Sequence, residues 1–438
     1  MADHEPCVIE LNDAGISIVD RDGLLARSPG YAFVDGGELL VGDQAAMRVR
    51  TNPRAGFDSF WSHLDRQPLT RAGGPARDHA DLAYFHLRAL WQSLPGPRGP
   101  AVLVVPDDLD EQQLALILGI ADACGIAVSA LVPAAVAAAA ALPEPRDCLV
   151  LDARLHRMTV TRVDANGDLQ LGTVRRPGDS GLVALYDAWL QALAGESLAQ
   201  TRFDPRNSAA SEQRMFDALP GWLQTLCERE HAGLSLDAGA HVHRIEIARS
   251  TLVEAAAGFY RPLLAAAAEA GERAVIVRER LESLPGLAPA LAEQCRRLVA
   301  VDTTELGRVL LDRPEPFAAH DSEERPYLAT LGAATGTAAA YRPGRRAAPT
   351  HLLHRGIAYP LTTQGVSLAS GAQPGPHAGA ALIRPWDDGQ VRLECPDGVE
   401  AQVVRAAGGD DDGLAAGDRI WLGAEHFQLI AVHQADEA

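Results

Sequence analysis

The sequence predicts an α/β protein of two similar lobes, followed by a small all-β domain. Short β-branched runs divided by Asp-Gly and Gly-Gly turns are typical of a β-meander, and they precede alternating helices and strands. The same order, a meander followed by helices and strands, begins again near residue 148. From about residue 356 to residue 432, short alternating segments are separated by Gly, Pro and Asp clusters and show no helical period. The chain therefore predicts a duplicated α/β unit and a separate β domain.

The first lobe is expected to open with strands and to continue with helices that alternate with further strands. The predicted strands lie at residues 7–10, 17–19, 31–34, 39–41, 101–105 and 127–131. The predicted helices lie at residues 81–94, 112–124 and from 134 onward. The acidic turn at residues 107–111 is typical of a helix start.

The second lobe repeats this order. Its predicted strands lie at residues 148–152, 158–163, 169–174 and 274–277, and its predicted helices at residues 182–193, 212–230, 250–269 and 327–340. The segment 342–356 begins with a stretch rich in arginine, proline and alanine, which predicts a linker. We therefore expect an α/β domain at 1–341, a linker at 342–356 and a β domain at 357–438.

Composition excludes several classes of function. The 438 residues include 58 acidic and 39 basic side chains, so the net charge of −19 repels phosphate backbones and anionic membranes. The chain has no lysine, which excludes Schiff-base and P-loop chemistry. The six cysteines form no CxxC pair, and no apolar run is long enough to span a membrane. We therefore expect a cytoplasmic protein with reduced thiols, no nucleic-acid partner and no membrane span, and the Ala and Arg bias suggests a bacterial source.

Several segments resemble motifs of one family, in the same order and at matching spacing. Residues 28–29, 37–45 and 51–53 follow that family's TPS, GE-x-LVG-x-A and TNP motifs. Later segments that resemble its motifs lie at 104–106, 112–113, 121–126, 133–138, 260–263 and 329–334. Residues 7–341 thus resemble the nucleotide-binding domain of DnaK-type heat-shock chaperones. The resemblance implies the two-lobed actin-like ATPase fold, which actins and sugar kinases share.

The positions that bind phosphate in that family are altered in this chain. The family's first phosphate loop, IDLGTT, corresponds to residues 9–14 here, which carry Glu10 and no tight glycine. Its second loop, DLGGGT, corresponds to 152–157, and its adenosine loop, VGGSSR, to 277–282. Side chains replace the glycines of both loops, so the backbone cannot approach a phosphate closely. Because these loops depart from the family's pattern, we expect the cleft to have no catalytic residues and to bind no cofactor or metal.

A few positions still match the family's nucleotide contacts. Glu228, His231 and Ser235 have the spacing of its E-x-x-K-x-x-x-S motif, and we expect them on a helix. A solvated helix face is the simpler interpretation of Glu228 and His231. The residues of this vestigial nucleotide cleft are Glu10, Asp152, Gly178, Asp179, Glu228, His231 and Ser235.

Arginines stand at several positions where the family has small residues. These arginines are Arg154, Arg157, Arg278 and Arg280. Because the loops that carry them should face each other, we expect ion pairs between the lobes. The expected partners are Glu10, Asp152 and Glu279.

Other motifs are interpreted as structural. Residues 178–181 spell the GDSG of trypsin-like proteases, but this isolated match lies inside the chaperone-like lobe and we treat it as coincidence. His241 and His243 lack a third zinc ligand at suitable spacing, so we expect surface histidines. Residues 410–412 suit a solvated hairpin tip better than a calcium loop. The last hairpin, 414–430, resembles that of a forkhead-associated domain, although the residues that bind phosphothreonine are not found.

The sequence predicts a DnaK-like pseudo-ATPase that serves as an interaction, regulatory or chaperone-like scaffold for a protein partner, without ATP hydrolysis. The alternative is a divergent DnaK-family chaperone or actin-like ATPase. Such a protein would bind ATP with magnesium through Glu10, Asp152 and residues 228–235. A serine hydrolase based on GDSG is the third possibility.

Overall fold

A computed structural model of the chain divides into two compact units, Met1–Gly336 and Thr337–Ala438. In the first unit the structure describes residues 5–69, 74–96, 98–144, 146–178, 180–237, 241–313, 315–317 and 327–332. In the second it describes residues 349–354, 357–368, 374–375, 380–386, 390–396, 399, 401–404, 414, 419–422 and 425–430. The two units are described separately below.

The first unit contains a five-stranded sheet formed by the start of the chain. Three strands form an antiparallel meander, and two further strands run parallel to the first. The order across the sheet is β3-β2-β1-β7-β8. The strands are β1 (Cys7–Glu10), β2 (Ile16–Asp20), β3 (Gly23–Ser28), β7 (Ala101–Val105) and β8 (Val128–Pro133).

A second, six-stranded sheet repeats this arrangement. Its order is β15-β14-β9-β10-β11-β16, and five of its strands reproduce both the order and the directions of the first sheet. The added strand, β16, pairs with the edge of the meander. The strands are β9 (Cys148–Ala153), β10 (Met158–Asn166), β11 (Asp168–Arg175), β14 (Ala274–Arg278), β15 (Leu298–Val301) and β16 (Thr330–Gly332). The duplication expected from the sequence is therefore present in the strand order.

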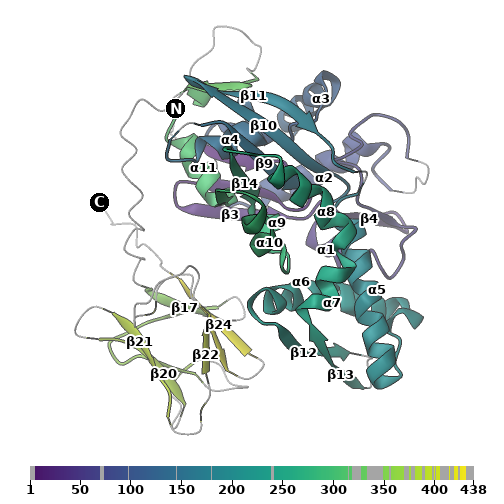
Figure 1. Cartoon of the computed structure of the whole chain (residues 1–438), viewed down its shortest axis with the longest axis vertical. Coiled ribbons are helices and arrows are strands. Elements are labelled where there is room, and N and C mark those ends of the chain that lie inside the picture. The colour runs from purple at the N-terminus through teal and green to yellow at the C-terminus, as the bar shows by residue number, and fades with distance from the viewer. Residues whose placement is uncertain are drawn as a thin grey trace. The chain divides into compact units, whose positions relative to one another are not determined.

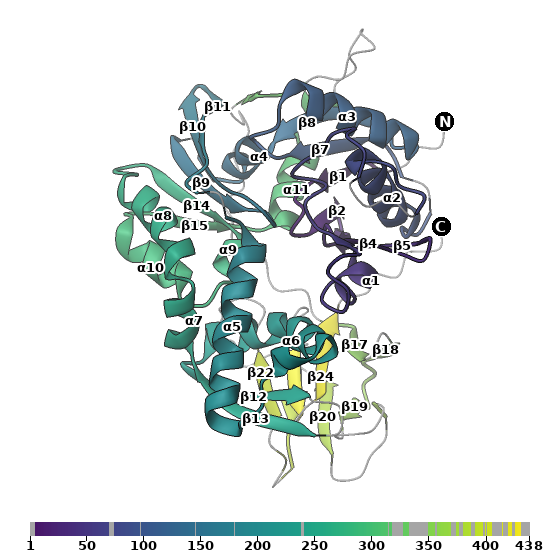
Figure 2. The same cartoon turned by 90° about the vertical axis from the view of Figure 1, so that its right-hand side faces the viewer.

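Two helices pack together between the sheets. Helix α4 (Ala134–Ala140) follows the first sheet in the chain but packs on β9, β10 and β11, whereas α11 (Thr303–Leu311) follows the second sheet and packs on β1, β2 and β3 (Figure 2). All seven residues of α4 are buried. Because alanine and valine side chains are small, they allow this close approach of a helix to its neighbours.

Other helices cover the opposite faces of the sheets (Figure 1). Side chains alternate along each strand, so Ile9 faces the helices over the first sheet while Val8 faces α4 and α11. The covering helices are α2 (His79–Gln92) and α3 (Glu111–Ala123) on the first sheet, and α7 (Arg249–Ala255), α8 (Ala257–Ala268), α9 (Glu279–Glu282) and α10 (Leu287–Gln294) by the second. The predicted acidic helix start is confirmed, because Asp110 and Gln113 form a capping box at α3.

Each large sheet carries a smaller insertion. The first insertion contains β4 (Ala32–Asp35), β5 (Glu38–Val41), α1 (Asp43–Ala46) and β6 (Gly56–Phe57). The second contains α5 (Leu182–Thr201), α6 (Ala209–Glu228) and the hairpin of β12 (His231–Asp237) and β13 (Val242–Ala248). Short 3-10 helices lie at Pro205–Asn207 and Glu315–Phe317.

The described elements of Thr337–Ala438 are strands in two sheets. The orders are β18-β17-β24-β23-β22 and β19-β20-β21, around a core that includes Leu352, Ile383 and Phe427. The strands are β17 (His351–His354), β18 (Ile357–Pro360), β19 (Val366–Leu368), β20 (Ala381–Pro385), β21 (Val391–Glu394), β22 (Ala401–Val404), β23 (Arg419–Leu422) and β24 (Glu425–Ile430). The hairpin tip expected at residues 410–412 lies outside the described residues.

Three sequence predictions differ from the structure. The helix expected at 327–340 is wrong for its described part, because Thr330–Gly332 is strand β16 and its pairing with β11 buries Leu331. The helix expected at 250–269 is two helices that meet at Ala256. The linker expected at 342–356 includes β17, which pairs with β18 and β24, while residues 342–348 and 355–356 lie outside the described part.

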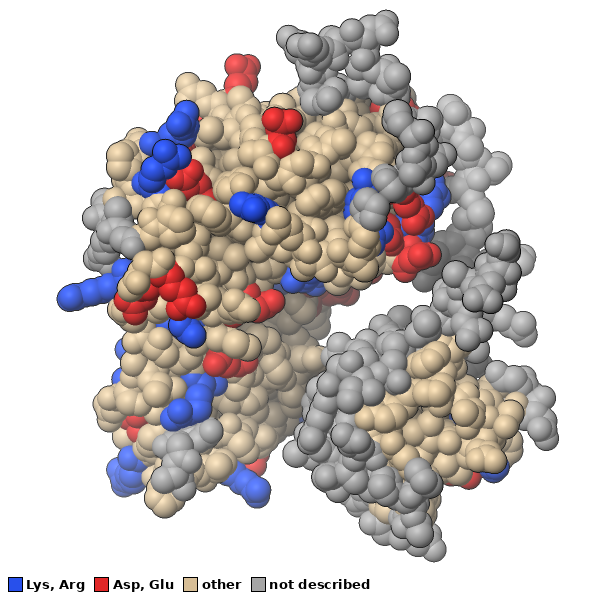
Figure 3. Space-filling view, turned by 180° about the vertical axis from the view of Figure 1, so that it is seen from behind, with Lys and Arg blue, Asp and Glu red and all other residues tan. Residues whose placement is uncertain are grey.

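Charged side chains are scattered over the described surface. Figure 3 shows one face, on which arginine and acidic side chains lie interspersed among uncharged residues. Among the described helices, none combines the length and the apolar character that a membrane crossing requires.

Enlarging a side chain in the middle of α4 should destabilise the first unit, because Ala138 is completely buried. We expect Ala138→Leu to lower the free energy of unfolding by about 1–3 kcal/mol through overpacking. Urea denaturation would measure it. The matched control is Ala123→Leu at the exposed end of α3, which should change stability by less than about 0.5 kcal/mol. Equal effects of the two variants would contradict the packing described for α4.

Candidate functional site

A buried carboxylate lies at the centre of the first unit. Glu10, the last residue of β1, is 1% exposed, and Arg278, the last residue of β14 in the other sheet, is completely buried. Arg278 Nη2 donates to Glu10 Oε1 at 3.0 Å and to Oε2 at 3.1 Å. One side chain from each sheet thus forms a buried ion pair that joins the two sheets.

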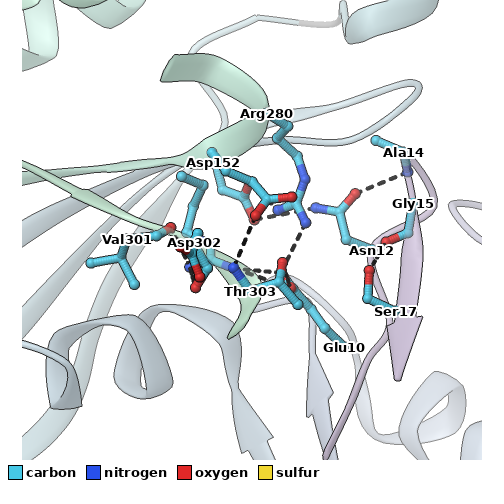
Figure 4. Close-up of polar contacts among 12 residues, drawn as sticks. Glu10, Asn12, Ala14, Gly15, Ser17, Asp152, Arg280, Val301, Asp302 and Thr303 are labelled. Atoms are coloured by element: carbon cyan, nitrogen blue, oxygen red, sulfur yellow. Dashed lines mark hydrogen bonds and ion pairs between the residues drawn. The ribbon is translucent and has the colours of Figure 1, made fainter. Parts of the chain in front are cut away.

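A second arginine extends this pair into a network (Figure 4). Arg280, from α9, donates through Nη2 to Glu10 Oε1 at 3.0 Å and through Nη1 to Asp152 Oδ1 at 2.9 Å. Thr303, the first residue of α11, donates its hydroxyl to Glu10 Oε2 at 2.6 Å. Two carboxylates and two guanidinium groups are therefore enclosed together, and their formal charges sum to zero.

The loop after β1 is held to the same network. Asn12 Nδ2 donates to Asp152 Oδ2 at 3.2 Å and to the carbonyl oxygen of Ala153 at 3.1 Å. The side-chain oxygen of Asn12 in turn accepts the N–H of Ala14 at 2.9 Å. The neighbouring Asp13 accepts the N–H of Leu155 at 2.7 Å. These bonds tie the loop that follows β1 to the loop that follows β9.

Glu10 and Arg280 remain ionised over a wide pH range. Burial alone would raise the pKa of Glu10, but the guanidinium groups of Arg278 and Arg280 outweigh burial and hold that pKa well below its usual range. Burial alone would lower the pKa of Arg280, but Asp152 and Glu10 hold it above its usual range. Both partners therefore keep their charges at neutral pH.

A second charged cluster surrounds Asp108, directly after β7. Its carboxylate pairs with Arg154, with Arg157 Nη1 at 3.2 Å and with Arg176 Nε at 2.9 Å. Burial would raise the pKa of Asp108, but Arg154 and Arg176 dominate and lower it. The loop after β9 is thus bound to the loop after β7 as well as to the loop after β1.

The backbone of the loop after β9 leaves few donors for a bound anion. The first N–H groups of α5 would otherwise form an anion site. Instead, Leu182 donates to the carbonyl oxygen of Arg154 and Val183 to that of Leu155, both at 2.9 Å. Gly181 stands against this loop, where an added Cβ would lie 2.4 Å from Arg157 N. Gly181, the second glycine of the GDSG sequence, therefore has a packing role here.

A small cavity remains between the loops. Its polar lining consists of Glu10, Asn12, Asp107, Asp152, Arg154 and Thr159. The cavity leaves about 10 Å³ for the centres of water molecules, which corresponds to about one water. A nucleoside triphosphate cannot enter a space of this size without separating the loops.

Asp107 differs from the other carboxylates of this region, because its hydrogen-bond partners among the described residues include no arginine. Its oxygens accept the N–H of Ala135 at 2.9 Å and the hydroxyl of Thr161 at 2.8 Å. Burial raises the pKa of Asp107 from 3.8 to about 6. Burial therefore moves the titration of this carboxyl group toward neutral pH.

The two insertions also meet above the network. Tyr31, Phe33 and Val49 of the first insertion form an apolar cluster with Leu155, and Phe216 of α6 packs against it. The rings of Tyr31 and Phe216 lie edge to face with their centroids 6.2 Å apart. An apolar contact therefore closes the side of the molecule on which the insertions approach each other.

Polar contacts reinforce this closure. Gln213 of α6 accepts the N–H of Arg50 at 2.8 Å and donates to the carbonyl oxygen of Ala46 at 2.8 Å. Arg50 pairs with Asp187 at 2.6 Å, and its guanidinium lies 4.9 Å from the centre of the Phe216 ring. The first insertion is thus bound to both helices of the second.

The predicted site residues separate into two groups. Glu10 and Asp152 lie in one network, as the resemblance implied. Gly178 is exposed and forms no hydrogen bond with that network among the described residues, and Asp179 lies outside them. The structure therefore brings together two of the seven predicted residues.

The helix expected through Glu228, His231 and Ser235 is wrong. Glu228 ends α6, whereas His231 and Ser235 belong to strand β12. Burial alternates along β12, with Ala232, Leu234 and Leu236 buried and the residues between them exposed, which is the period of a strand. Ser235 lines a pocket of about 70 Å³ between α6 and β12, away from Glu10. These residues form no nucleotide-binding helix face.

The predicted ion pairs are confirmed for Arg278 and Arg280. Arg154 and Arg157 also form ion pairs, but with Asp108, which the sequence prediction did not include. Glu279 pairs with Arg27 and accepts the N–H of Thr303 at 3.0 Å. The position of Asp108 directly after a buried strand could have identified it, because the ends of parallel strands meet at one sheet edge.

The two histidines expected at the surface, His241 and His243, are exposed and half-buried, respectively. His243 stacks on Phe203 with ring centroids 4.4 Å apart. Within the described part of the chain, the group of carboxylates close enough to share a cation is Glu5, Asp20 and Asp22, which contains neither histidine. Asp20 already pairs with Arg98 at 3.0 Å.

Removing the side chain of Arg278 should lower the free energy of unfolding far more than removing that of an exposed arginine. We expect Arg278→Met to reduce the free energy of unfolding by about 3–5 kcal/mol, because it leaves the buried Glu10 short of a partner. Arg21→Met, which breaks an exposed pair with Asp312, is the control and should cost less than about 1 kcal/mol. Chemical denaturation of both variants measures the difference. Similar losses in the two variants would argue against a central role for the buried pair.

Asp107→Asn should stabilise the protein in a pH-dependent way. Because the folded-state pKa of Asp107 is raised, the folded state binds the proton more tightly, and stability is lost as pH rises from about 4 to about 6. Asparagine does not titrate and can still bond Ala135 and Thr161. We expect the variant to gain about 3 kcal/mol over the parent above pH ~6 and little near pH ~4. Denaturation at several pH values tests this, with the exposed Asp122→Asn as control; a difference independent of pH would contradict it.

Comparisons with known proteins add no functional assignment. A scan against models of protein families found no match, and a search of characterised proteins found no relative. The function is therefore argued from the geometry of the site together with the sequence motifs.

Proposed function

We propose that this chain is a DnaK-like pseudo-ATPase whose actin-like fold serves as an interaction or regulatory scaffold. The observation that carries the proposal is the network of Glu10, Asp152, Arg278 and Arg280. It occupies the place where the loops after β1, β9 and β14 meet, which are the loops that bind nucleotide in the family that the sequence resembles.

The strand order supports the fold assignment. The order β3-β2-β1-β7-β8 of the first sheet is repeated as β11-β10-β9-β14-β15 in the second. Each sheet is followed in the chain by a helix that packs on the other sheet. Such a duplicated α/β unit is what the resemblance to the DnaK nucleotide-binding domain implies. Fold alone does not give an activity, so the functional argument rests on the loops.

The chemistry of the network argues against a bound triphosphate. A polyphosphate needs cations or free backbone donors. Here Arg278, Arg280 and Arg154 already pair with carboxylates, and bringing phosphate beside Glu10 and Asp152 would place like charges together at low dielectric. Opening the loops would cost the buried pairs and the contact between Tyr31 and Phe216.

The loss of nucleotide chemistry leaves protein binding as the function that this scaffold supports best. We propose a protein partner and a cytoplasmic location, without a cofactor. The strands of Thr337–Ala438 would then form a second binding module, which resembles a forkhead-associated domain in its last hairpin. The alternative, a divergent ATP-binding chaperone or ATPase, requires the ion-pair network to open.

Magnesium ATP should leave the stability of the protein unchanged. A ligand at one hundred times its dissociation constant stabilises the folded state by about 2.7 kcal/mol. We expect no change in melting temperature at millimolar ATP, and no release of phosphate. An active actin-like ATPase, treated in parallel, should show the shift.

A melting shift of several degrees together with phosphate release would overturn the pseudo-ATPase proposal. Loss of that shift in Glu10→Gln, but not in the exposed Glu293→Gln, would place the nucleotide in the cleft and establish the alternative.

A further inference from the structure

One contact between the two duplicated parts of the first unit involves a histidine. His156 lies in the loop after β9, residues 154–157, and Asp58 begins the loop after β6, residues 58–65. His156 Nε2 lies 3.0 Å from Asp58 Oδ1. This pair therefore ties a loop of the second sheet to the end of the first insertion.

The pair belongs to a larger interface between these two loops. Asp13 accepts the hydroxyl of Ser62 at 2.8 Å and the N–H of Leu155 at 2.7 Å, so it bonds to both loops. Leu155 also packs in the apolar cluster that contains Tyr31 of the first insertion. The loop after β9 is thus positioned by several contacts with residues of the first sheet and its insertion.

His156 and Asp58 lie at the rim of this interface. The side chain of His156 is 30% exposed and that of Asp58 is 37% exposed. Protons can therefore reach the pair from solvent. This distinguishes the pair from Glu10 and Arg278, which are buried and stay paired at neutral pH.

The surroundings of His156 favour its protonated form. The hydrogen bond to Asp58 and the negative charges of Asp58 and Asp13 raise the pKa of His156 above 6.5, although burial opposes them. Because this pKa is raised, the folded state binds the proton more tightly than the unfolded chain does. The resulting stabilisation is fully present below pH ~6.5 and is lost as the pH rises through the pKa of the folded state.

Other charged groups lie around His156. Asp13 of the loop after β1 faces it, and His63 of the loop after β6 lies close enough to interact with it electrostatically. Burial and the positive charges of Arg157, His79 and His156 lower the pKa of His63. His63 therefore titrates below pH ~6.5, whereas His156 titrates above it.

We propose that His156 and Asp58 form a pH-sensitive latch between the loop after β9 and the loop after β6, which is closed near pH 6.5 and loosens as the pH rises. The neutral imidazole can still donate a hydrogen bond, but it no longer carries the charge that attracts Asp58. The buried pairs of Glu10 join the sheets at either pH, so the expected change is more frequent local opening of the loop after β9. The inference goes beyond the proposed scaffold and does not depend on whether nucleotide binds.

Amide hydrogen exchange of the full-length protein tests the latch. Exchange of residues 154–157 is measured by mass spectrometry at pH 6.5 and at pH 8.5, and is corrected for the pH dependence of the intrinsic exchange rate. We expect the protection of this segment to fall by about 2–5-fold at the higher pH, which is the range that a partly exposed ion pair supports.

Two variants should remove this pH dependence. His156→Gln keeps a neutral donor, and Asp58→Asn keeps an acceptor without the negative charge, so each should show the lower protection at both pH values. The matched control is His79→Gln. His79 Nδ1 also lies 3.0 Å from a carboxylate oxygen, Oδ1 of Asp65, but this pair joins the start of α2 to the loop after β6 and does not reach the second sheet. The control should retain the fall in protection between pH 6.5 and pH 8.5.

The parent protein alone can overturn the proposal, because equal protection of residues 154–157 at the two pH values would show that the pair is no latch. A fall that persists in either His156→Gln or Asp58→Asn, or that disappears in His79→Gln, would assign the pH dependence to other groups and would overturn it as well. Melting curves confirm that each variant remains folded. A nuclear magnetic resonance titration of the His156 ring should give a pKa above 6.5 in the parent, and a value at or below 6.5 would contradict the latch.

Discussion

The bidentate pair between Glu10 and Arg278 is the interaction on which the centre of the first unit depends. It joins the last residue of β1 to the last residue of β14, so it links the two duplicated sheets at the point where their loops converge. A lone carboxylate at this depth would be very unfavourable, because an unpaired ion loses its hydration without compensation. Arg280 and Thr303 complete the coordination of Glu10, and each of them brings another element to the same point.

The same pairs restrict how the unit can move. A two-lobed protein that binds ligand between its lobes must be able to separate them. Here separation would break the contacts of Glu10, the three arginine pairs of Asp108 and the apolar contact between Tyr31 and Phe216. Packed interfaces of this kind are stable in discrete arrangements rather than along a continuous path. The interior therefore favours one closed arrangement, which is consistent with the scaffold role proposed above.

Much of the α/β part could be predicted from the sequence because its signals are local. Strands such as 101–105 are continuous apolar runs, and the start of α3 is marked by the capping pair of Asp110 and Gln113. Errors arose where distant residues decide the structure. Thr330–Gly332 is a strand because β11 offers an edge, although its sequence suits a helix.

The residues of the site could likewise be predicted where the signal is local, and not where distant residues decide their contacts. Glu10 and Asp152 could be named from loop motifs, and their pairing with Arg278 and Arg280 from the facing of those loops. The partner of Arg154 was missed, although Asp108 follows the buried strand β7, and the parallel pairing of β7 with β1 brings the ends of these strands together. His231 and Ser235 were misplaced because a motif spacing was read as a helix, while the alternation of Ala232 and Leu234 indicated a strand.

The absence of lysine has a structural counterpart in this network. Arg280 reaches two carboxylates at once, Glu10 through one nitrogen and Asp152 through another. Arg278 likewise bonds Glu10 through Nη2 and the carbonyl oxygen of Val301 through Nη1. A planar guanidinium with several fixed donors can do this, whereas an ammonium is a point charge that loses its proton more readily when it is buried. If the proposed relationship to the DnaK family holds, the arginines that stand in these loops are also the cations that stabilise them. The same side chains would then account both for the missing phosphate site and for the closed interior.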